Sequence, residues 1–305
     1  MISLGDINKN INRVKEKYPD LCIDSIFCEK NGILNKVFYH DECLHEFRSC
    51  SKILVSMAVG IAIDKKMFSL DTIIYPSLKN IVDITNENNL QKIKKWTIKN
   101  LLTHTTGYEW QMMSENYIQN INKNNLLDYA LNYDIPYEVG TRFAYNNLEP
   151  FILSVFFQQT FNKNLSDFIK ENIFDKIDIT DYKWDNYWKY CPAATGLYLK
   201  HSDFHKIGEL ILNDGKYGDY QVISKIWIDK MCSVQLETPS AYKPERVLPK
   251  FAIGYYTFIS RDGFIFRDGS NGQYIIVNKD RNLLITIMST EKEMKYVTEI
   301  LRDLI

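Results

Sequence analysis

The sequence carries no surplus of charge of either sign. It holds 37 Lys and Arg residues against 38 Asp and Glu residues, which gives a formal net charge of -1. Proteins that bind nucleic acids or anionic membranes electrostatically need a cationic surface. The charge balance therefore predicts neither a nucleic-acid partner nor a membrane partner.

Long hydrophobic runs are also missing. The longest ones, "ILVSMAVGIAI" and "FILSVFF", are shorter than the ~20 apolar residues that a membrane-spanning helix needs. The opening stretch, "MISLGDINKNINRVKEKYPD", lacks the basic and then apolar segments of a secretory signal. We therefore expect a cytoplasmic protein.

Cysteine follows no pairing motif in this sequence. A chain of 305 residues can bury a large core without disulfides, so most of its thiols are expected to be free and buried. No two cysteines have the CxxC spacing of redox or zinc motifs, and we expect no cofactor and no metal. The cysteines are Cys22, Cys28, Cys43, Cys50, Cys191 and Cys232.

Strand patterns stand at both ends of the sequence. Near the N-terminus an amphipathic helix over 4–18 precedes a hairpin, in which apolar runs flank "NG" at Asn31 and Gly32. Four apolar or alternating runs separated by turns lie between residues 251 and 289. A final helix is predicted over 291–305.

Helical segments and loops fill the middle of the sequence. We therefore predict a mixed α/β fold of the α+β type, in which one antiparallel sheet is built from both chain ends and is flanked by helices. Residues 1–69 and 250–305 would form the sheet domain, and 70–249 an inserted, mainly helical lobe. A site between the two parts is expected, and the two parts would form one catalytic unit.

A polar cluster opens the helix predicted from about residue 49. Ser49 and Lys52 are three residues apart in "RSCSKILVSMAVGIAID", which places them one turn apart on the same helix face. The unpaired N–H groups and the dipole of a helix start favour negative charge at Ser49. Burial or nearby positive charge would lower the pKa of Lys52 from ~10.4, which would make it a base. A helix cap followed by a surface lysine would give the same spacing.

Two further segments carry candidate polar groups. Tyr145 and Asn147 follow a glycine turn and precede an apolar helix, where a phenol and an amide can move protons and bind substrate. A turn in "FRDGSNGQYIIV" enters a strand whose N–H groups could complete an oxyanion hole. An ordinary loop or hairpin would explain either segment alone.

Together these segments resemble the serine beta-lactamase-like hydrolases. That family includes class C beta-lactamases, DD-peptidases, esterases and an oligomer amidohydrolase, and Ser-x-x-Lys is one of its signatures. The resemblance covers roughly residues 47–287 and implies a beta-lactamase/transpeptidase-like fold. It depends on five blocks in the expected order: "RSCSKILVSMAVGIAID", "LLTHTTG", "YEVGTRFAYNN", "AATGLYLKHSDFHKIGELILNDGKYGDYQVISKIWI" and "SNGQYIIV".

The resemblance implies a role for each matching residue. Ser49 corresponds to the acylated nucleophile and Lys52 to its partner base. Tyr145 and Asn147 correspond to the Tyr-x-Asn element, and Tyr145 would share proton transfer with Lys52. By position, the N–H of Gln273 would join that of Ser49 in the oxyanion hole.

The third element of the family departs from its usual pattern here. It begins with Lys or His in relatives, but this chain reads Ser270-Asn271-Gly272 at that place. A serine supplies no charge to hold a lactam carboxylate. Arg267 is a nearby cation, and whether it replaces the missing charge or points elsewhere is left open by the sequence. The resemblance is therefore closest to the esterase and amidohydrolase branch.

Other candidate residues have plainer explanations. His104 lies in a helix end that turns through Gly107 and is expected to be structural. His201 and His205 are four apart, but Ser202 and Asp203 are expected to cap a helix between them, so the two rings need not share a face. We expect no Glu, Cys or third His at ligand spacing from this pair, which argues against zinc.

Two aromatic residues and one thiol complete the list of candidates. Trp184 and Trp188 would pack between the lobes or line a substrate wall. Cys50 adjoins Ser49 but would face another side of the helix, so it is a poor alternative nucleophile.

The sequence therefore predicts a serine hydrolase that forms an acyl-enzyme through Ser49, activated by Lys52 and Tyr145, with small esters or amides as substrates. The predicted substrate-binding residues are Asn147, Ser270, Asn271, Gly272 and Gln273. One alternative is a beta-lactamase or DD-peptidase that acts on lactams or peptidoglycan peptides. A second alternative is a ligand-binding relative without catalysis.

Overall fold

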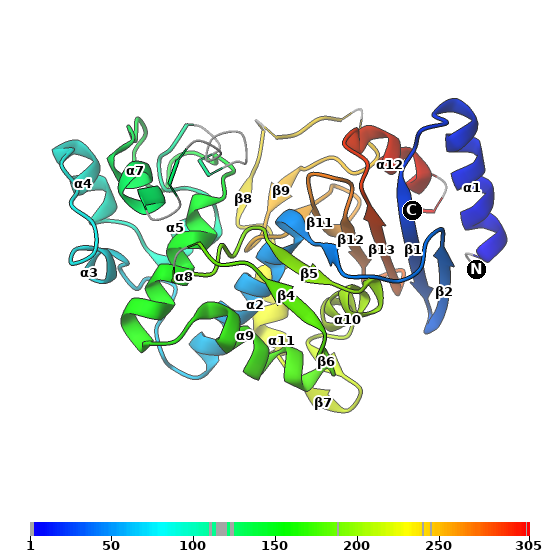
Figure 1. Ribbon diagram of the computed structural model, residues 1–305, viewed down its shortest axis with the longest axis horizontal. Helices are drawn as coiled ribbons and strands as arrows, with labels where there is room; N and C mark the ends of the chain where they lie inside the picture. Colours follow the sequence, from blue (N-terminus) through cyan, green and yellow to red (C-terminus); the bar gives the residue numbers. More distant parts are fainter. Residues whose placement is uncertain are drawn as a thin grey trace.

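An eight-stranded antiparallel sheet runs from the middle of the molecule to the side where the two chain ends lie (Figure 1). The computed structural model describes residues 3–109, 112–113, 121–122, 125–187, 189–239, 241–244, 246–302 and 304–305. The strand order is β2 (Ile33–Phe38), β1 (Ile23–Lys30), β13 (Leu283–Ser289), β12 (Tyr274–Asn278), β11 (Ile265–Asp268), β10 (Phe258–Ile259), β9 (Ala252–Ile253) and β8 (Leu236–Glu237).

The two chain ends meet in this sheet, as predicted. Strand β1 pairs with β13 along its length, with Phe27 opposite Thr286 and Glu29 opposite Leu284. The hairpin between β1 and β2 turns at Asn31, whose φ is 53°, and Gly32, whose φ is 75°. Two positive φ angles in a two-residue loop match the twist of the flanking strands, which explains the "NG" signal.

One predicted strand is two strands in the structure. The run over 251–260 divides into β9 and β10, because the chain turns tightly at Gly254, whose N–H donates to the carbonyl of Thr257 at 2.8 Å. A Cβ at Gly254 would lie 2.1 Å from the carbonyl oxygen of Met231, so only glycine fits there. The pattern of apolar residues over 251–260 is continuous, so the sequence pattern does not reveal this turn.

Helices cover both faces of the sheet. On one face, α1 (Leu4–Lys17) and α12 (Met294–Leu301) pack against each other over a core that includes Ile26 and Ile285. On the other face, α10 (His201–Leu212) packs on β12 and β13 over Ile275 and Leu284. The alternation of strand side chains between two apolar layers accounts for the nearly continuous hydrophobic runs in β12 and β13.

The middle of the chain is mainly helical. Helix α2 (Lys52–Asp64) leads into it from a short 3-10 turn, η1 (Arg48–Ser51). The other helices are α3 (Tyr75–Leu78), α4 (Glu87–Ile93), α5 (Ile98–Leu102), α7 (Leu126–Asn132), α8 (Leu148–Phe161), α9 (Leu165–Asn172), η3 (Phe174–Lys176) and α11 (Lys225–Met231). A small sheet contains β3 (His45–Glu46), β5 (Leu197–Leu199) and β4 (Tyr182–Trp184), and a hairpin contains β6 (Lys216–Tyr217) and β7 (Tyr220–Gln221).

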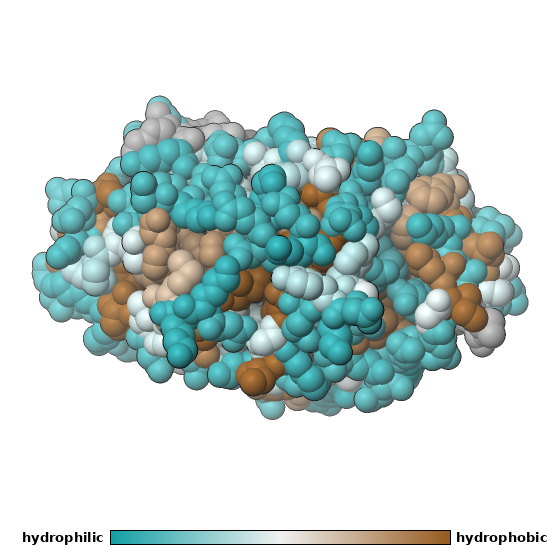
Figure 2. Space-filling view, turned by 90° about the horizontal axis from the view of Figure 1, so that it is seen from below, coloured by the Kyte–Doolittle hydropathy of each residue, from teal (hydrophilic) through white to brown (hydrophobic). Residues whose placement is uncertain are grey.

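The predicted fold class is confirmed: the chain is a mixed α/β protein with an antiparallel sheet and flanking helices. The division into 1–69 with 250–305 and an inserted lobe over 70–249 stays a prediction. Within the described residues, no helix is long and apolar enough to cross a membrane. One face of the molecule is mostly hydrophilic, with scattered hydrophobic residues between (Figure 2).

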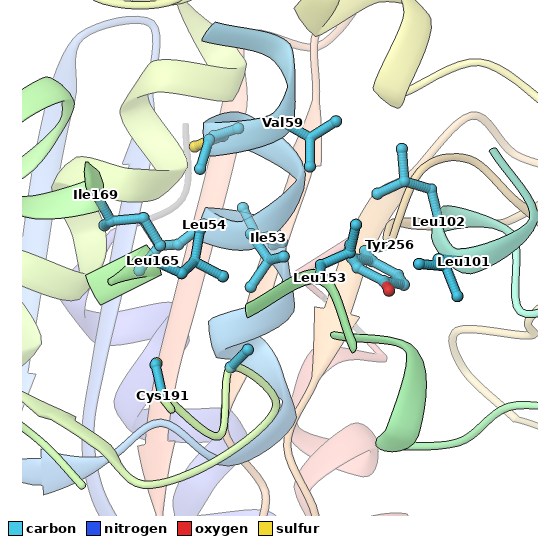
Figure 3. Packing of buried hydrophobic residues seen from close by; sticks show 14 of the residues in the cluster. Ile53, Leu54, Val59, Leu101, Leu102, Leu153, Leu165, Ile169, Cys191 and Tyr256 are labelled. Atoms are coloured by element: carbon cyan, nitrogen blue, oxygen red, sulfur yellow. The ribbon is translucent and has the colours of Figure 1, made fainter. Parts of the chain in front are cut away.

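Helix α2 is buried on all sides, which explains why its sequence is apolar throughout. Ile53 and Leu54 lie between α9, which contributes Leu165 and Ile169, and a second group of apolar side chains that includes Leu153 of α8 (Figure 3). Helix α11 packs on the same helix. A helix that is apolar all round belongs in a core, and its start is thereby fixed in place.

Close contact between α2 and α11 depends on Gly60. A Cβ at Gly60 would lie 2.2 Å from the indole ring of Trp227. We therefore predict that Gly60→Ala lowers the free energy of unfolding by about 1–3 kcal/mol, because overpacking must displace the indole. Urea unfolding measures this loss.

Gly5→Ala in helix α1 is the matched control. The nearest heavy atom to a Cβ at Gly5 is 3.5 Å away, so the better helix propensity of alanine should leave stability unchanged or raise it slightly. Equal effects of the two substitutions would contradict the packing assigned to α2 and α11.

Candidate active site

The predicted nucleophile lies at the start of the buried helix. Ser49 is in η1, the turn that leads directly into α2. The preceding residue, Arg48, has a φ of 51°, and its Nε lies 2.7 Å from Oε2 of Glu46. A residue other than glycine keeps a left-handed backbone conformation only where the surrounding structure holds it there. The conformation of the turn that carries Ser49 is therefore well determined.

Four predicted residues come together around the Ser49 hydroxyl. Lys52 Nζ lies 3.2 Å from Ser49 Oγ, and the Tyr145 hydroxyl donates to the same Oγ at 2.8 Å. Lys52 Nζ is also 2.9 Å from the Tyr145 hydroxyl and donates to Asn147 Oδ1 at 2.6 Å. A hydroxyl, an amine, a phenol and an amide thus share one hydrogen-bonded group.

The segment that carries Tyr145 and Asn147 is shaped by the residue between them. Asn146 is fully buried, and its Oδ1 accepts from the N–H groups of Leu148 and Glu149 at the start of α8. Asn147 Nδ2 donates to the carbonyl of Met113 at 3.1 Å, which leaves its Oδ1 turned toward Lys52. The sequence Tyr-Asn-Asn therefore combines a helix cap with two site residues.

Arg267 of strand β11 completes this group. Its side chain is fully buried, Nη2 donates to the Tyr145 hydroxyl at 2.7 Å, and Nε donates to the carbonyl of Ser49 at 3.0 Å. The guanidinium carbon lies 4.9 Å from the ring centroids of both Tyr145 and Phe258. The sequence alone does not fix the direction of this side chain, and its one signal in the sequence is its closeness to the third family element.

Burial and charge set the protonation of the group. Burial lowers the pKa of Lys52 well below its usual value, and the positive charge of Arg267 lowers it further. Burial raises the pKa of Tyr145, while Arg267 and the hydrogen bond to Ser49 oppose the rise. A neutral Lys52 amine can accept the Ser49 proton while Tyr145 remains a proton donor, which is the state a nucleophile needs.

The predicted third element forms a hairpin turn beside this group. Residues 269–273 connect β11 to β12, with the Gly269 N–H donating to the Gln273 carbonyl and a φ of 84° at Gly272. Gln273 Nε2 donates to the carbonyl of Ser289, and its Oε1 accepts from the Asn271 N–H. Ser270 is exposed in this turn.

The four predicted residues of this turn do not join the central group through their side chains. Within the described residues, the hydrogen bonds of these side chains do not reach Ser49, Lys52, Tyr145 or Asn147. The turn instead contacts the nucleophile segment through the Cys50 thiol, which lies 3.7 Å from the Gln273 carbonyl. The side chain that reaches the site from this hairpin is Arg267.

His104 belongs to a buried hydrogen-bond network next to the segment that carries Tyr145. Its Nδ1 is 3.1 Å from Glu149 Oε2, and burial lowers the pKa of His104 to about 4, although Glu149 opposes this. Glu149 is fully buried and also accepts from Thr106 Oγ1 and Asn146 Nδ2 at 2.7 and 2.8 Å. This network connects the "LLTHTTG" and "YNN" segments, so His104 is structural, as expected.

Cys50 is fully buried, and burial raises the pKa of its thiol. A protonated thiol directed at the carbonyls of Arg267 and Gln273 is a poor nucleophile, which agrees with the sequence analysis.

Trp184 packs partly buried against the larger core and donates to the Thr195 carbonyl at 3.2 Å. Trp188 lies outside the described residues.

We expected Ser202 and Asp203 to cap a helix between His201 and His205, so that the two rings need not share a face, and this was wrong. Helix α10 begins at His201, before Ser202 and Asp203, so His201 and His205 lie one turn apart on one face. Both rings contact the hydroxyl of Thr286 on β13, at 2.9 and 2.8 Å. A helix start placed two residues too late concealed this arrangement.

A comparison with protein-family models identifies the family of this chain. The family model described as Beta-lactamase matches residues 36–225, which is more than half of the chain. No curated protein sequence matches.

Several solved structures share the fold. EstCE1, described as a hydrolase with promiscuous acyltransferase activity, has a TM-score of 0.78 at 13% identity, covering 99% of each chain. The penicillin binding protein from Bacillus halodurans has a TM-score of 0.74 at 13% identity, covering 100% of this chain and 99% of that one. A protein from Bacillus anthracis, provisionally assigned as a 6-aminohexanoate-dimer hydrolase, has a TM-score of 0.73 at 18% identity, covering 95% and 79%. At these identities the likeness concerns the fold.

The buried carboxylate of Glu149 should be essential to the loop that carries Tyr145. We predict that Glu149→Ala lowers the free energy of unfolding by at least about 2 kcal/mol, because it leaves the donors of His104, Thr106 and Asn146 unpaired. Chemical denaturation of the variant checks the value.

Glu138→Ala is the control, since Glu138 makes an exposed ion pair with Lys95 at 3.5 Å. That substitution should change stability by less than about 0.5 kcal/mol. A Glu149→Ala variant as stable as the control would show that the network does not support the site.

Proposed function

Because the chain belongs to the beta-lactamase family, we propose that it is a serine hydrolase that forms an acyl-enzyme at Ser49. The observation that carries this proposal is the Ser49 hydroxyl, which contacts a fully buried lysine amine at 3.2 Å and a phenol at 2.8 Å. Burial and Arg267 lower the pKa of that lysine. Such a pair of groups suits nucleophile activation and proton return.

The hydrogen bonds are consistent with a neutral Lys52. Its two N–H bonds can donate to Asn147 Oδ1 and to the Tyr145 oxygen, which leaves the nitrogen lone pair for the Ser49 hydroxyl. Tyr145 in turn donates to Ser49 Oγ. Every polar group then has a partner, and the Ser49 proton faces the base.

Acylation would begin with this proton. Ser49 Oγ attacks the carbonyl carbon of the substrate while its proton passes to Lys52 Nζ, and the carbonyl oxygen becomes an oxyanion. When the tetrahedral intermediate collapses, Tyr145 gives its proton to the leaving alcohol or amine, and Lys52 returns a proton to Tyr145. In deacylation, water takes the place of the leaving group and the proton transfers run in reverse.

Arg267 would keep Lys52 and Tyr145 in the protonation states that proton transfer needs. Its charge disfavours a second positive charge on Lys52 and favours negative character on the Tyr145 oxygen, to which it donates at 2.7 Å. We assign to Ser49 N–H the first place in the oxyanion hole, because it lies in the first turn of η1. The second place, predicted for the Gln273 N–H, belongs to this proposal as well.

Small esters or amides are the substrates we propose. Two nitrogens of Arg267, Nε and Nη2, are already bound to Ser49 and Tyr145, and Ser270 brings no charge. A lactam carboxylate would therefore have to compete for a cation that is in use. EstCE1 is described as a hydrolase with promiscuous acyltransferase activity, and the Bacillus anthracis protein is provisionally assigned as a 6-aminohexanoate-dimer hydrolase.

Lactam turnover is the second candidate function, and one observation favours it. Arg267 Nη1 is buried beside the Ser49 group without a hydrogen-bond partner among the described residues, so one nitrogen of the cation is unused. If this nitrogen held a carboxylate, the chain would process lactams in place of simple esters.

We predict that Ser49 becomes covalently acylated. Exposure to a fluorophosphonate, to p-nitrophenyl acetate and to a cephalosporin, followed by intact mass and peptide mapping, should place an ester-derived or phosphonate adduct on Ser49. Ser49→Ala should abolish both the adduct and the turnover. The adduct also separates a hydrolase from a ligand-binding relative without catalysis.

An adduct on any other residue would contradict the mechanism. Faster acylation by the cephalosporin than by the ester would favour the second candidate function. Alkylation of the exposed thiols Cys22 and Cys43 before labelling serves as the control for labelling at a thiol.

We predict that Arg267 shifts the acid limb of ester turnover. Lys52 must be neutral, so activity is lost as the pH falls through its folded pKa, which Arg267 lowers. In Arg267→Gln the pKa of Lys52 rises, and the acid limb of kcat/KM should move to higher pH. Arg267→Lys keeps a charge and should shift it less.

The measurement is a pH–rate profile with a neutral ester. Arg302→Gln is the matched control, because Arg302 pairs with Glu299 at 2.7 Å, its side chain is half exposed, and it is not among the charges that shift the pKa of Lys52. An unchanged acid limb in Arg267→Gln would remove Arg267 from the mechanism.

A further inference from the structure

A second polar cluster lies between helix α10 and strand β1, and it shares no residue with the Ser49 group. His201, His205 and Glu209 recur at four-residue intervals on α10, so they form one stripe on that helix. The facing strand contributes Ser25, Phe27 and Glu29, which alternate in β1 and therefore point to the same side of the sheet. The stripe packs against this row.

Close approach of the helix to the sheet depends on Gly208. A Cβ at this position would lie 2.5 Å from Cδ1 of Leu284, which is paired with Glu29 on the neighbouring strand. The small residue lets α10 come down onto β13. As a result, the side chains on either side of Gly208 along the helix face meet those of β1.

One hydrogen-bonded chain runs through the cluster. The Ser25 hydroxyl bonds to His201 Nδ1, and His201 Nε2 is 2.9 Å from Thr286 Oγ1. The same Thr286 oxygen is 2.8 Å from His205 Nδ1. His201 is also stacked on Phe27, with ring centroids 3.9 Å apart. The orientation of both rings is therefore fixed.

The chain ends on a nitrogen without a partner. Burial lowers the pKa of His201 well below its usual value, and His205 and His45 add to this, so His201 is neutral. Two proton assignments give each bond of the chain one proton, and the reverse one would place an N–H on His205 Nε2 facing Glu29. In the assignment that leaves Nε2 free for a metal ion, His205 Nδ1–H donates to Thr286 and the Thr286 hydroxyl donates to His201 Nε2. His205 Nε2 then presents a lone pair, and within the described residues it has no hydrogen-bond partner.

Two carboxylates face that lone pair. His205 Nε2 is 3.4 Å from Glu29 Oε2, which also lacks a hydrogen-bond partner among the described residues. The His205 side chain is 2% exposed and that of Glu29 is 14% exposed. Glu209 brings the third donor, and one ligand atom from each of the three residues lies within 4.8 Å of the others.

A lone pair and two carboxylates that converge without a cation would repel one another. Two ligand bonds of ~2.0–2.1 Å that meet at a tetrahedral angle place their donor atoms ~3.3 Å apart. The 3.4 Å between His205 Nε2 and Glu29 Oε2 fits this spacing. A metal-bound histidine needs an acceptor on its other ring nitrogen to fix the tautomer and the ring orientation, and the Thr286 hydroxyl can take that place for His205.

We propose that Glu29, His205 and Glu209 bind one divalent transition-metal ion of the Zn²⁺ type. One imidazole nitrogen and two carboxylate oxygens form a donor set that suits Zn²⁺ and Co²⁺ better than Ca²⁺ or Mg²⁺. Because the ligands come from α10 and β1, the ion would join this helix to the N-terminal hairpin. Its expected effect is on stability, since no ligand belongs to the Ser49 group.

The test uses the full chain after removal of metal with EDTA. Cys22 and Cys43 are exposed thiols, so the protein is first alkylated to prevent thiolate binding. Co²⁺ is then titrated and followed by its visible absorption, and Zn²⁺ is titrated by calorimetry with Mg²⁺ as the comparison ion. We expect one equivalent of Co²⁺ or Zn²⁺ to bind, Zn²⁺ to raise Tm, and Mg²⁺ to have no effect.

Three variants assign the site to these residues. Glu209→Gln keeps the shape of the partly buried carboxylate and should weaken Co²⁺ binding by at least about tenfold, and His205→Gln should abolish it. Thr286→Val should weaken binding by about 10–100-fold through the loss of ring orientation. Glu171→Gln, on the exposed face of α9, and His45→Gln are the matched controls and should bind as the unmodified protein does.

Two results would overturn the proposal. One is the absence of stoichiometric Co²⁺ and Zn²⁺ binding to the alkylated protein, which would mean that a proton on His205 balances the carboxylates. The other is binding that persists unchanged in Glu209→Gln. Glu209→Gln preserves side-chain volume, so a failure of His205→Gln to fold would leave this second result available.

Discussion

The structure around Ser49 depends on one electrostatic constraint, the burial of two basic side chains beside a single phenol. Lys52 and Arg267 are both fully buried and both contact the Tyr145 hydroxyl, at 2.9 and 2.7 Å. Two full positive charges at this distance in a poorly solvated place are unfavourable, and a guanidinium does not lose its proton. Burial and the charge of Arg267 therefore lower the pKa of Lys52, and an amine that gives up its proton more readily suits the base proposed for Ser49.

The rest of the fold holds this arrangement in place. Helix α2 is packed on all sides, so the turn that carries Ser49 cannot move away from Lys52. The sheet brings Arg267 from the far end of the sequence, because β11 reaches the nucleophile segment. The His104–Glu149 network fastens the loop that carries Tyr145. Chemistry at one hydroxyl thus depends on segments from three separate parts of the chain.

Much of this could be predicted from sequence, for identifiable reasons. Ser49 and Lys52 are three residues apart on one helix, and Asn31-Gly32 marks a hairpin, so local spacing was sufficient. Arg267 could not be placed, because its partners Ser49 and Tyr145 lie 218 and 122 residues earlier in the sequence. Glu209 was not recognised as a possible metal ligand beside His205, because the third residue of the group, Glu29, lies on a strand that is distant in the sequence. Local patterns define elements, whereas the sheet and helix packing decide which side chains meet.

The most direct test of this account is the charge of Lys52. NMR titration of protein labelled with ¹³C at the lysine Cε, with the Lys52 signal identified by its loss in Lys52→Arg, reports the pKa of that amine. The account predicts one lysine signal that titrates well below the ordinary value of ~10.4 and moves back toward it in Arg267→Gln. A Lys52 signal that titrates at the ordinary value would contradict it, because the base assigned to Ser49 would then be charged at neutral pH.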